Sequence, residues 1–290
     1  MVEKESKPNT KKKLFFGLFV FPLLIAVGMA ILLSTIVFLT KEEETPESLI
    51  KAIKTGAPSK RWQKAFELSN ELNGKSGMIR SAGIRQEIIH ILSDPAHYDA
   101  KTRAYMAMAL SRFRDSESER ALREALDQAN DDEEPEVPIF LMWALGSFED
   151  PVQADAIAHF LSSKHNDLRK TAAYVLGVLG NRSAVAKLVP LLEDSVGDVQ
   201  WNAALSLARL GDSSGEKVLL QMLDRNYLKN IHQINDSQVE AVMVNAAKGL
   251  TLIRSPEAVS VLEQVSEHDQ SLKVREAALA ALEFQNKSLK

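Results

Sequence analysis

The feature that most constrains this chain is an internal repeat of 31 residues between Asp167 and Asp212. The segment DLRKTAAYVLGVLGN is followed by a short helical stretch, AVAKLVPLLEDS, and then by DVQWNAALSLARLGD, which has the same pattern as the first segment. A period of this length predicts a solenoid of stacked helical hairpins, because one hairpin has too little apolar surface to fold alone and must bury it against its neighbours.

The pattern recurs along the chain when the position of Arg169 is taken as position zero of each unit. A small or apolar residue then stands at position +4 and a leucine at position +7 of each predicted second helix. The zero positions are Arg61, Arg103, Pro138, Arg169, Gln200, Met243 and Arg275. No stretch alternates apolar and polar residues as a strand does. The sequence therefore predicts an all-α, right-handed α-solenoid of about seven hairpins.

The gaps between zero positions range from 31 to 43 residues, so the longer units contain extra residues. We expect these residues in the connections between helices, where polar and turn-forming residues gather. The three candidate connections are NGKSG at 73–77, DDEEPE at 131–136 and RNYLKNIHQINDS at 225–237.

An uncharged stretch of 27 residues, 14–40, precedes the repeats. A helix needs about 20 apolar residues to cross a bilayer, and the apolar region of a signal peptide has only about 7–15. The sequence therefore predicts three segments: a basic head at 1–13, a transmembrane helix at 14–40 and a repeat domain at 41–290. A cleaved signal peptide is the alternative, although no small-x-small cleavage site follows the stretch.

Charges on either side of the apolar stretch predict its orientation. Five lysines lie within residues 1–13, whereas Lys41 is followed at once by three glutamates. Because positive flanks stay in the cytoplasm, we expect a cytoplasmic N-terminus in the inner (cell) membrane. The repeat domain would then be extracytoplasmic, and periplasmic in a Gram-negative bacterium. The opposite orientation remains open, since further basic residues lie between Lys51 and Arg61.

Composition excludes several functions. Residues 41–290 contain 30 basic and 37 acidic residues, a net charge of −7, so we expect no nucleic-acid partner. The chain has no cysteine, which excludes disulfides, thiol catalysis and thiolate metal sites.

The segments LRKTAAYVLGVLGN and DVQWNAALSLARLGD resemble the HEAT-like repeats found in phycobilisome lyases. In that family an Asp and a Val-Arg pair precede an alanine-rich second helix that ends in Leu-Gly. KTRAYMAMALSRF and LKVREAALAALEF match this pattern less closely, and units one, three and six match it weakly. The resemblance spans about 240 residues. It implies the fold, but it leaves the function open because the family includes scaffolds, adaptors and enzymes.

The resemblance also suggests a role for the arginines at position zero. In such repeats this arginine bonds to an aspartate or to the backbone of the adjacent unit and so holds the stack together. Arg103, Arg169 and Arg275 are the candidates, and the matching acids are Asp99, Asp167 and Asp198. An anion-binding ladder is the alternative, but Pro138, Gln200 and Met243 interrupt it.

We predict no catalytic residue, no metal site and no cofactor. None of the six histidines is followed by glutamate, so the His-Glu pairs of HEAT-repeat di-iron hydroxylases are missing. Metalloprotease, nucleophile-elbow and phosphate-loop motifs are also missing from the sequence. The acidic run at 131–136 lacks the glycine turn and the alternating ligands of a calcium loop.

One pattern suggests a binding surface. Position +5, which is often polar in HEAT-like units, is apolar or aromatic in units one to five, and position +1 adds three large residues on the same helix face. The eight residues are Trp62, Phe66, Met108, Ile139, Trp143, Tyr174, Trp201 and Leu205. Because second helices line the inner surface of such a superhelix, we expect an apolar stripe that binds protein. The alternative is that these side chains pack between units.

The sequence thus predicts a non-enzymatic, single-pass membrane-anchored scaffold that binds a protein partner through its concave face. We expect the partner to be another membrane or periplasmic protein, with this chain as an accessory subunit of an envelope assembly. The alternative function is a lyase-like or chaperone-like protein that acts on a cofactor or bound client.

Overall fold

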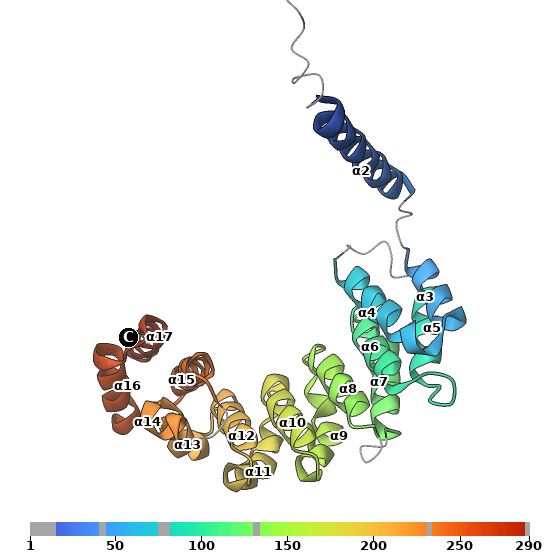
Figure 1. The fold of residues 1–290 in the computed structure, drawn as a ribbon. Helices are drawn as coiled ribbons and strands as arrows, with labels where there is room; N and C mark the ends of the chain where they lie inside the picture. The colour runs from blue at the N-terminus through green and yellow to red at the C-terminus, as the bar shows by residue number, and fades with distance from the viewer. Residues whose placement is uncertain (1–15, 41–44, 75–81, 130–133, 231–233, 288–290) are drawn as a thin grey trace, which may run out of the picture. The chain divides into compact units, whose positions relative to one another are not determined.

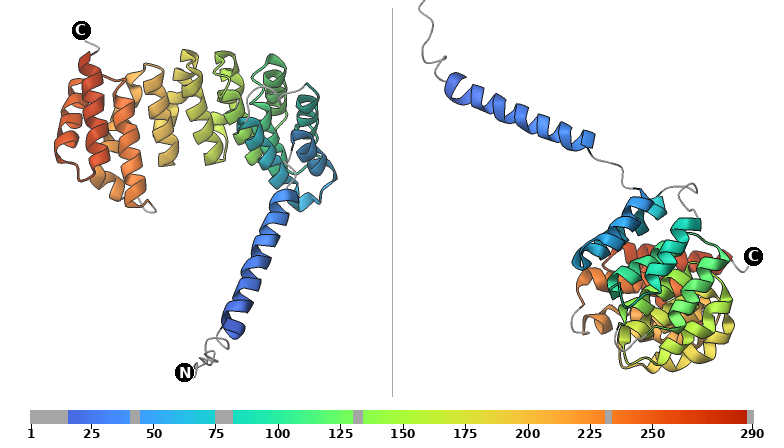
Figure 2. Two further views of the ribbon diagram at one scale, coloured as in Figure 1. Left: turned by 90° about the horizontal axis from the view of Figure 1, so that it is seen from above. Right: turned by 90° about the vertical axis from the view of Figure 1, so that its right-hand side faces the viewer.

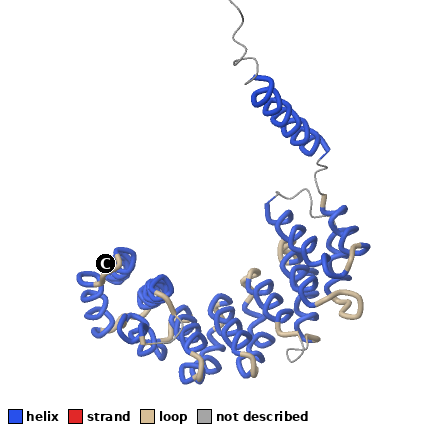
Figure 3. Tube along the Cα trace, in the orientation of Figure 1, coloured by secondary structure: helices blue, strands red, loops and turns tan. Residues whose placement is uncertain are grey.

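A computed structural model describes residues 16–40, 45–74, 82–129, 134–230 and 234–287. Every regular element in these ranges is a helix (Figure 3). The chain divides into two compact units, Met1–Thr45 and Pro46–Lys290. The predicted basic head at 1–13 lies outside the described residues.

The N-terminal unit is one apolar helix. A π-helical stretch, η1 (Phe16–Val20), continues into α2 (Phe21–Thr40). The window from Leu18 to Thr35 is apolar and none of it is buried. Its length and composition suit a membrane span, although a signal sequence passes the same test. The hydroxyl of Thr35 donates to the carbonyl of Ile31 over 2.8 Å, which satisfies its polar group within the helix.

The second unit is a row of helical hairpins. The first three pair α3 (Pro46–Thr55) with α4 (Pro58–Gly74), α5 (Ala82–Leu92) with α6 (Ala100–Leu110), and α7 (Ser116–Asp127) with α8 (Glu136–Gly146). The fourth pairs η2 (Pro151–Gln153), α9 (Ala154–Ala158) and η3 (His159–Ser162) with α10 (Asn166–Leu179). The fifth pairs η4 (Arg182–Ala184), α11 (Val185–Leu188) and η5 (Val189–Glu193) with α12 (Gly197–Arg209).

The sixth hairpin pairs η6 (Ser213–Gly215), α13 (Glu216–Leu223) and α14 (Arg225–Lys229) with α15 (Asp236–Leu250), and the seventh pairs α16 (Pro256–His268) with α17 (Leu272–Lys287). The predicted solenoid of seven hairpins is confirmed in the described part of the chain. Within the polar stretch at 225–237, the residues Arg225–Lys229 form the short helix α14, and residues 231–233 lie outside the described residues.

The hairpins stack in chain order and form two layers. Each second helix contacts the second helix of the next hairpin, from α4 through α6, α8, α10, α12 and α15 to α17. These helices lie on the inner side of the curved row in Figure 1, and the first helices lie on its outer side. In Figure 2 (left) successive helices stand side by side. The side chains on the free face of the second helices therefore share one inner surface.

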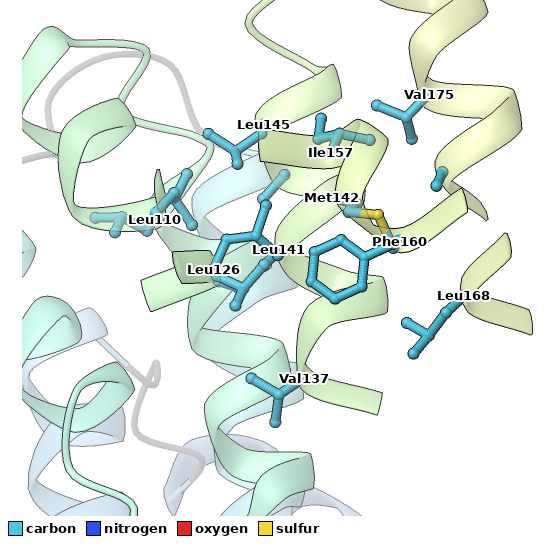
Figure 4. Packing of buried hydrophobic residues seen from close by; sticks show 14 of the residues in the cluster. Leu110, Leu126, Val137, Leu141, Met142, Leu145, Ile157, Phe160, Leu168 and Val175 are labelled. Carbon is cyan, nitrogen blue, oxygen red and sulfur yellow. The ribbon is translucent and has the colours of Figure 1, made fainter. Parts of the chain in front are cut away.

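The positions that define the repeat form the core. The leucines at position +7 are fully buried in the first six units: Leu68, Leu110, Leu145, Leu176, Leu207 and Leu250. Figure 4 shows Leu110 and Leu145 among the apolar side chains that fill the space around α8. Each buried leucine contributes roughly 1.5–3 kcal/mol relative to an exposed one. The seventh unit departs from the pattern at another position of the repeat, +4, where Leu279 is exposed.

Small residues at position +8 let neighbouring second helices approach closely. The occupants in the first six units are Ser69, Ser111, Gly146, Gly177, Ala208 and Thr251. A Cβ atom on Gly177 would lie 2.8 Å from the Cα atom of Ser206 on α12. Only glycine fits at this contact, because even a methyl group would overlap the backbone of the next unit. In the seventh unit position +8 is Glu283, which is exposed.

Arginines at position zero bond to the adjacent unit, as predicted, in two of the three cases. Arg169 donates from Nε and Nη2 to the Asp194 carboxylate over 2.7 and 2.9 Å. Arg103 donates to Glu134 over 2.7 Å. Arg275 instead donates to the backbone carbonyl of Asp269 in its own unit.

The predicted partner acids are wrong. Asp99 caps α6 by accepting from the backbone nitrogen of Thr102, and Asp167 pairs with Lys170. Asp198 lies 3.9 Å from Lys170. These aspartates begin second helices, whereas the true partners precede them, because the arginine reaches the connection of the next hairpin.

In the sixth unit position zero is Met243, which cannot form this ion pair, and another arginine forms it instead. Arg225, at the start of α14, donates from Nε and Nη2 to the Asp269 carboxylate over 3.0 and 2.7 Å. This fork repeats the geometry of Arg169 and Asp194 from a different backbone position. The inserted residues thus restore the ion pair that the repeat pattern lacks.

We expect Asp194→Asn to lower the free energy of unfolding at pH 7 by about 2 kcal/mol, because it removes a charge-assisted bond to a largely buried guanidinium. The hydrogen bonds from Arg169 hold the pKa of Asp194 below its ordinary value of 3.8. The carboxylate therefore stabilises the folded state above the unfolded pKa, and this contribution is lost as pH falls through the folded pKa. Urea unfolding at pH 7 and pH 3 measures both effects.

The matched control is Asp155→Asn, because Asp155 pairs with Lys187 but its side chain is 85% exposed. An exposed pair contributes little, so this variant should unfold as the parent does. A loss at Asp194→Asn that is equally large at pH 3 would contradict the assignment.

Candidate functional site

The predicted stripe lies on the second helices and most of it reaches the surface. Phe66 on α4 is 45% exposed and Trp143 on α8 is 43% exposed. Five further residues of the stripe are half-buried: Trp62, Met108, Ile139, Tyr174 and Leu205. Of the half-buried residues, Ile139, Tyr174 and Leu205 also pack against the hydrophobic core.

Trp201 is the exception. It is only 8% exposed and packs in the second hydrophobic cluster, together with Ala204 and Leu219. Its ring also lies 3.7 Å from the position of a Cβ atom on Gly197. Trp201 is therefore a buried residue of the second hydrophobic cluster, unlike the other seven residues of the predicted stripe.

Two residues that the sequence analysis did not single out connect the N-terminal part of the surface. Tyr105 and Phe140 occupy position +2 of α6 and α8. The Tyr105 ring stacks on Trp62 at 6.5 Å between centroids and meets Phe66 edge-on at 5.3 Å. It also meets Phe140 edge-on at 5.5 Å. Position +2 lies three residues before +5, so helical spacing could have revealed both residues.

The next pair continues the contact to the fourth unit. The rings of Trp143 and Tyr174 lie 4.9 Å apart at an angle of 44°. We call the six rings the aromatic track: Trp62, Phe66, Tyr105, Phe140, Trp143 and Tyr174. The track crosses the second helices of units one to four, and each contact joins two units. Such contacts stabilise the stack by about 0.5–1.5 kcal/mol per pair and also hold the rings in place.

Two cations of the same domain lie over rings of the aromatic track. The ammonium of Lys101 lies 3.6 Å from the Trp62 centroid, and the guanidinium of Arg209 lies 4.9 Å from the Tyr174 centroid. The faces of aromatic rings are negative and attract cations. The track therefore suits positively charged as well as apolar groups.

Apolar side chains outside the aromatic track are also exposed. Val178 in α10, Leu252 just after α15 and Phe284 in α17 are exposed at position +9 of units four, six and seven. Position +9 lies one helical turn after +5, so the apolar surface shifts toward the C-terminal ends of the second helices.

Charged residues of both signs lie near the ends of the second helices. Exposed acids stand in the first turns of α8, α10 and α12, where the helix dipole favours them: Glu136, Asp167 and Asp198. Toward the other ends of the second helices stand Arg112, Arg209 and Lys248. Lys101, in the first turn of α6, lies over Trp62, so the beginnings of the second helices carry charges of both signs.

A hollow in the described part of this unit lies away from the track. It measures about 670 Å³ and is lined by residues of α13, α14 and α16. It contains Arg225 and Asp269, whose charges satisfy each other. A smaller hollow of about 400 Å³ lies between α3 and α5 and contains the pair of Lys54 and Glu87. Among the described residues, no three histidines or acids are grouped to hold a metal ion.

Comparison with known proteins agrees with this geometry. The sequence model of HEAT repeats matches residues 85–174 and 155–231, which together make up half of the chain. This chain belongs to the HEAT repeat family. The comparison of this HEAT-repeat chain with curated proteins found no match.

Solved structures are similar to this HEAT-repeat protein. The complex of CpcE and CpcF of phycocyanin lyase from Nostoc sp. PCC7120 matches with 18% identity and a TM-score of 0.52, over 86% of this chain and 96% of that chain. The archaeal HEAT-like repeats protein from Thermococcus onnurineus NA1 matches with 13% identity and a TM-score of 0.45, over 86% and 100%. At such identities the first likeness shows the fold alone.

Replacing Trp143 or Trp201 by alanine should lower the free energy of unfolding by different amounts. We expect Trp143→Ala to lower the free energy of unfolding by less than about 1.5 kcal/mol, because it removes one exposed ring contact. Trp201→Ala should lower it by about 3–5 kcal/mol, because it empties a core position. Urea unfolding of the full chain in detergent, followed by circular dichroism, measures both. Equal losses would show that Trp143 is a core residue.

Proposed function

We propose that this HEAT-repeat protein is a non-enzymatic, membrane-anchored scaffold that binds a protein partner through the aromatic track. The observation that carries the proposal is the exposure of the Trp143 ring. Its ring is 43% exposed although it is held against Tyr174 by a contact between two units. Tryptophan and tyrosine are the residues that most often dominate the binding energy of protein interfaces.

The cost of leaving these rings in water supports a binding role. Six rings lie on four consecutive hairpins, and Val178 of the fourth hairpin and Leu252 of the sixth are also exposed. Exposed apolar surface of this extent usually marks an interaction site. The rings are also rigid, since each touches a ring of another unit, so binding would cost little side-chain entropy.

The apolar helix α2 supports membrane anchoring. Only five residues separate Thr40, at the end of α2, from Pro46, at the start of α3. Five residues span at most roughly 18 Å. An anchored repeat domain would therefore stay near the bilayer, where other envelope proteins are the available partners. The five lysines before the helix support a cytoplasmic N-terminus and an extracytoplasmic repeat domain.

Site-specific crosslinking in native membranes tests the binding surface. We expect a photoreactive phenylalanine analogue at position 143 to give one crosslinked product of defined mass, because the side chain would lie inside the interface. The matched control is the same analogue at position 152, since Val152 is 72% exposed but lies in η2, outside the second helices. The same product from both positions, or none at position 143, would overturn the proposal.

Protease accessibility tests the topology. In spheroplasts of a Gram-negative host, we expect added protease to digest the repeat domain, whereas a tag placed before residue 1 should be protected. Immunoblots against both ends measure this. Protection of the repeat domain together with loss of the tag would show the opposite orientation, and release of the repeat domain without α2 would show a cleaved signal sequence.

A further inference from the structure

One side of α17, in the seventh hairpin, corresponds to the side on which the other second helices meet the next hairpin. Position +8 marks this side in the interior of the stack. A Cβ atom on Gly146 would lie 2.9 Å from the side chain of Val175 in the next unit. One on Gly177 would likewise meet Ser206 of the next unit. Among the described elements α17 packs against α15 and α16, which leaves this side open.

Two exposed leucines lie on the open side of α17. Leu279 at position +4 is one turn before +8 and is 52% exposed, whereas the residue at position +4 is buried in the other six units. Leu272, two turns before Leu279, is 60% exposed. Arg275 and Glu283 lie on the same side by their helical spacing. We call these four residues the end face: Leu272, Arg275, Leu279 and Glu283.

Arginines at position zero in the interior of the stack divide their hydrogen bonds between two hairpins. Arg169 donates from Nη1 to the carbonyl of Ser163, six residues earlier in its own hairpin, over 2.9 Å. Its Nε and Nη2 donate to the Asp194 carboxylate of the next hairpin. Arg61 also reaches the next hairpin, where it donates to the carbonyl of His97 over 2.7 Å.

Arg275 makes only the first of these two kinds of bond within the described part of the chain. Its Nη1 donates to the carbonyl of Asp269, six residues earlier, over 2.7 Å, and no described residue accepts from its Nε or Nη2. These two nitrogens form the fork that holds a carboxylate in the interior units. Arginine forks bind carboxylates with two parallel hydrogen bonds. The end face therefore combines apolar side chains with a site for one acid.

The connections of this chain do not supply a matching acid. The acids that interior arginines meet in the next hairpin are Glu134, Asp194 and Asp269, and each is already paired. The connection of the first hairpin, TGAP at 55–58, contains no acid. A second copy that stacked its first hairpin on the end face would therefore leave the Arg275 fork without a carboxylate.

Glu283 distinguishes the end face from the interior of the stack. Position +8 is small in the first six units, which lets successive second helices approach closely. A glutamate at this position holds an occupant away from the C-terminal half of α17. Contact would then concentrate on Leu272, Arg275 and Leu279. Such a contact is smaller than those inside the stack, which suits docking between two proteins.

We infer that the end face docks a helical hairpin of a partner protein. The apolar side of that hairpin would meet Leu272 and Leu279, and an aspartate or glutamate in its connection would bond to the Arg275 fork. The contact would continue the stack of this chain into the partner. This second surface goes beyond the proposed function and does not depend on the aromatic track.

Site-specific crosslinking in native membranes tests the inference with the full chain. We expect a photoreactive phenylalanine analogue at position 279 to give one product with a partner protein. Mass spectrometry should place the crosslink in a helical hairpin with an aspartate or glutamate in its connection. The matched control is the same analogue at position 263, because Glu263 is exposed on α16 outside the end face, and it should not give this product.

Arg275→Gln removes the fork and keeps the bond within the hairpin. Gln200 shows this, because it occupies position zero of the fifth unit and donates to the carbonyl of Asp194, six residues earlier. We expect the variant to lower the crosslink yield at position 279 about tenfold, since a two-point charge-assisted bond is lost. Its urea midpoint should match that of the parent. Lys273→Gln is the control, because it removes an exposed cation of α17 outside the end face and should keep the yield.

Charge reversal tests the acid that mass spectrometry identifies. Arg275→Glu should abolish the product, because two carboxylates would face each other. Replacing the identified acid of the partner by arginine should restore the product with Arg275→Glu, since the pair then forms in the opposite direction. Failure of this restoration would show that the identified acid does not meet position 275 and would contradict the inference.

Four further results would overturn the inference. A product of twice the mass of the chain would show a second copy as the occupant, and a crosslink within the chain would show that another segment of the same chain covers the end face. Absence of a product at position 279, or a yield unaffected by Arg275→Gln, would exclude docking through the fork. Crosslinking at positions 143 and 279 is measured separately, so the failure of one surface leaves the other standing.

Discussion

The close contact between successive second helices is the constraint on which the rest of the structure depends. Position +8 is small in the first six units, and at Gly177 a single methyl group would overlap the backbone of α12. The leucines at position +7 fill the space behind this contact. One hairpin has no complete core of its own, so each hairpin is stable only when its neighbours are in place.

The same contact creates the candidate binding surface. Because second helices touch along their length, side chains at positions +2 and +5 of one unit reach those of the next. Tyr105 meets rings from both neighbouring units, and Trp143 meets Tyr174 across another boundary. In the proposed function, stability and recognition would therefore share residues. The rings support the stack through their contacts with neighbouring units, and their exposed area would be available to a partner.

The ion pairs show how an irregular sequence keeps regular packing. Arg169 reaches Asp194 in the connection of the next hairpin. In the sixth unit position zero is Met243, which cannot form this bond, and the insertion that lengthens the unit supplies Arg225 instead. The two ion pairs thus connect successive hairpins in the same way, although Arg169 and Arg225 hold different positions in the repeat.

The sequence alone determined the number of hairpins and the buried positions, because helical periodicity and a 31-residue repeat are local patterns that only a stack of helix pairs satisfies. It also indicated most of the concave stripe. Tertiary structure decided which large residues stay in water, since Trp201 and Trp143 stand in similar patterns but differ in how closely the next unit packs. It likewise decided the acid that each arginine meets, because these partners lie 25 to 44 residues apart and their contact depends on how the hairpins stack.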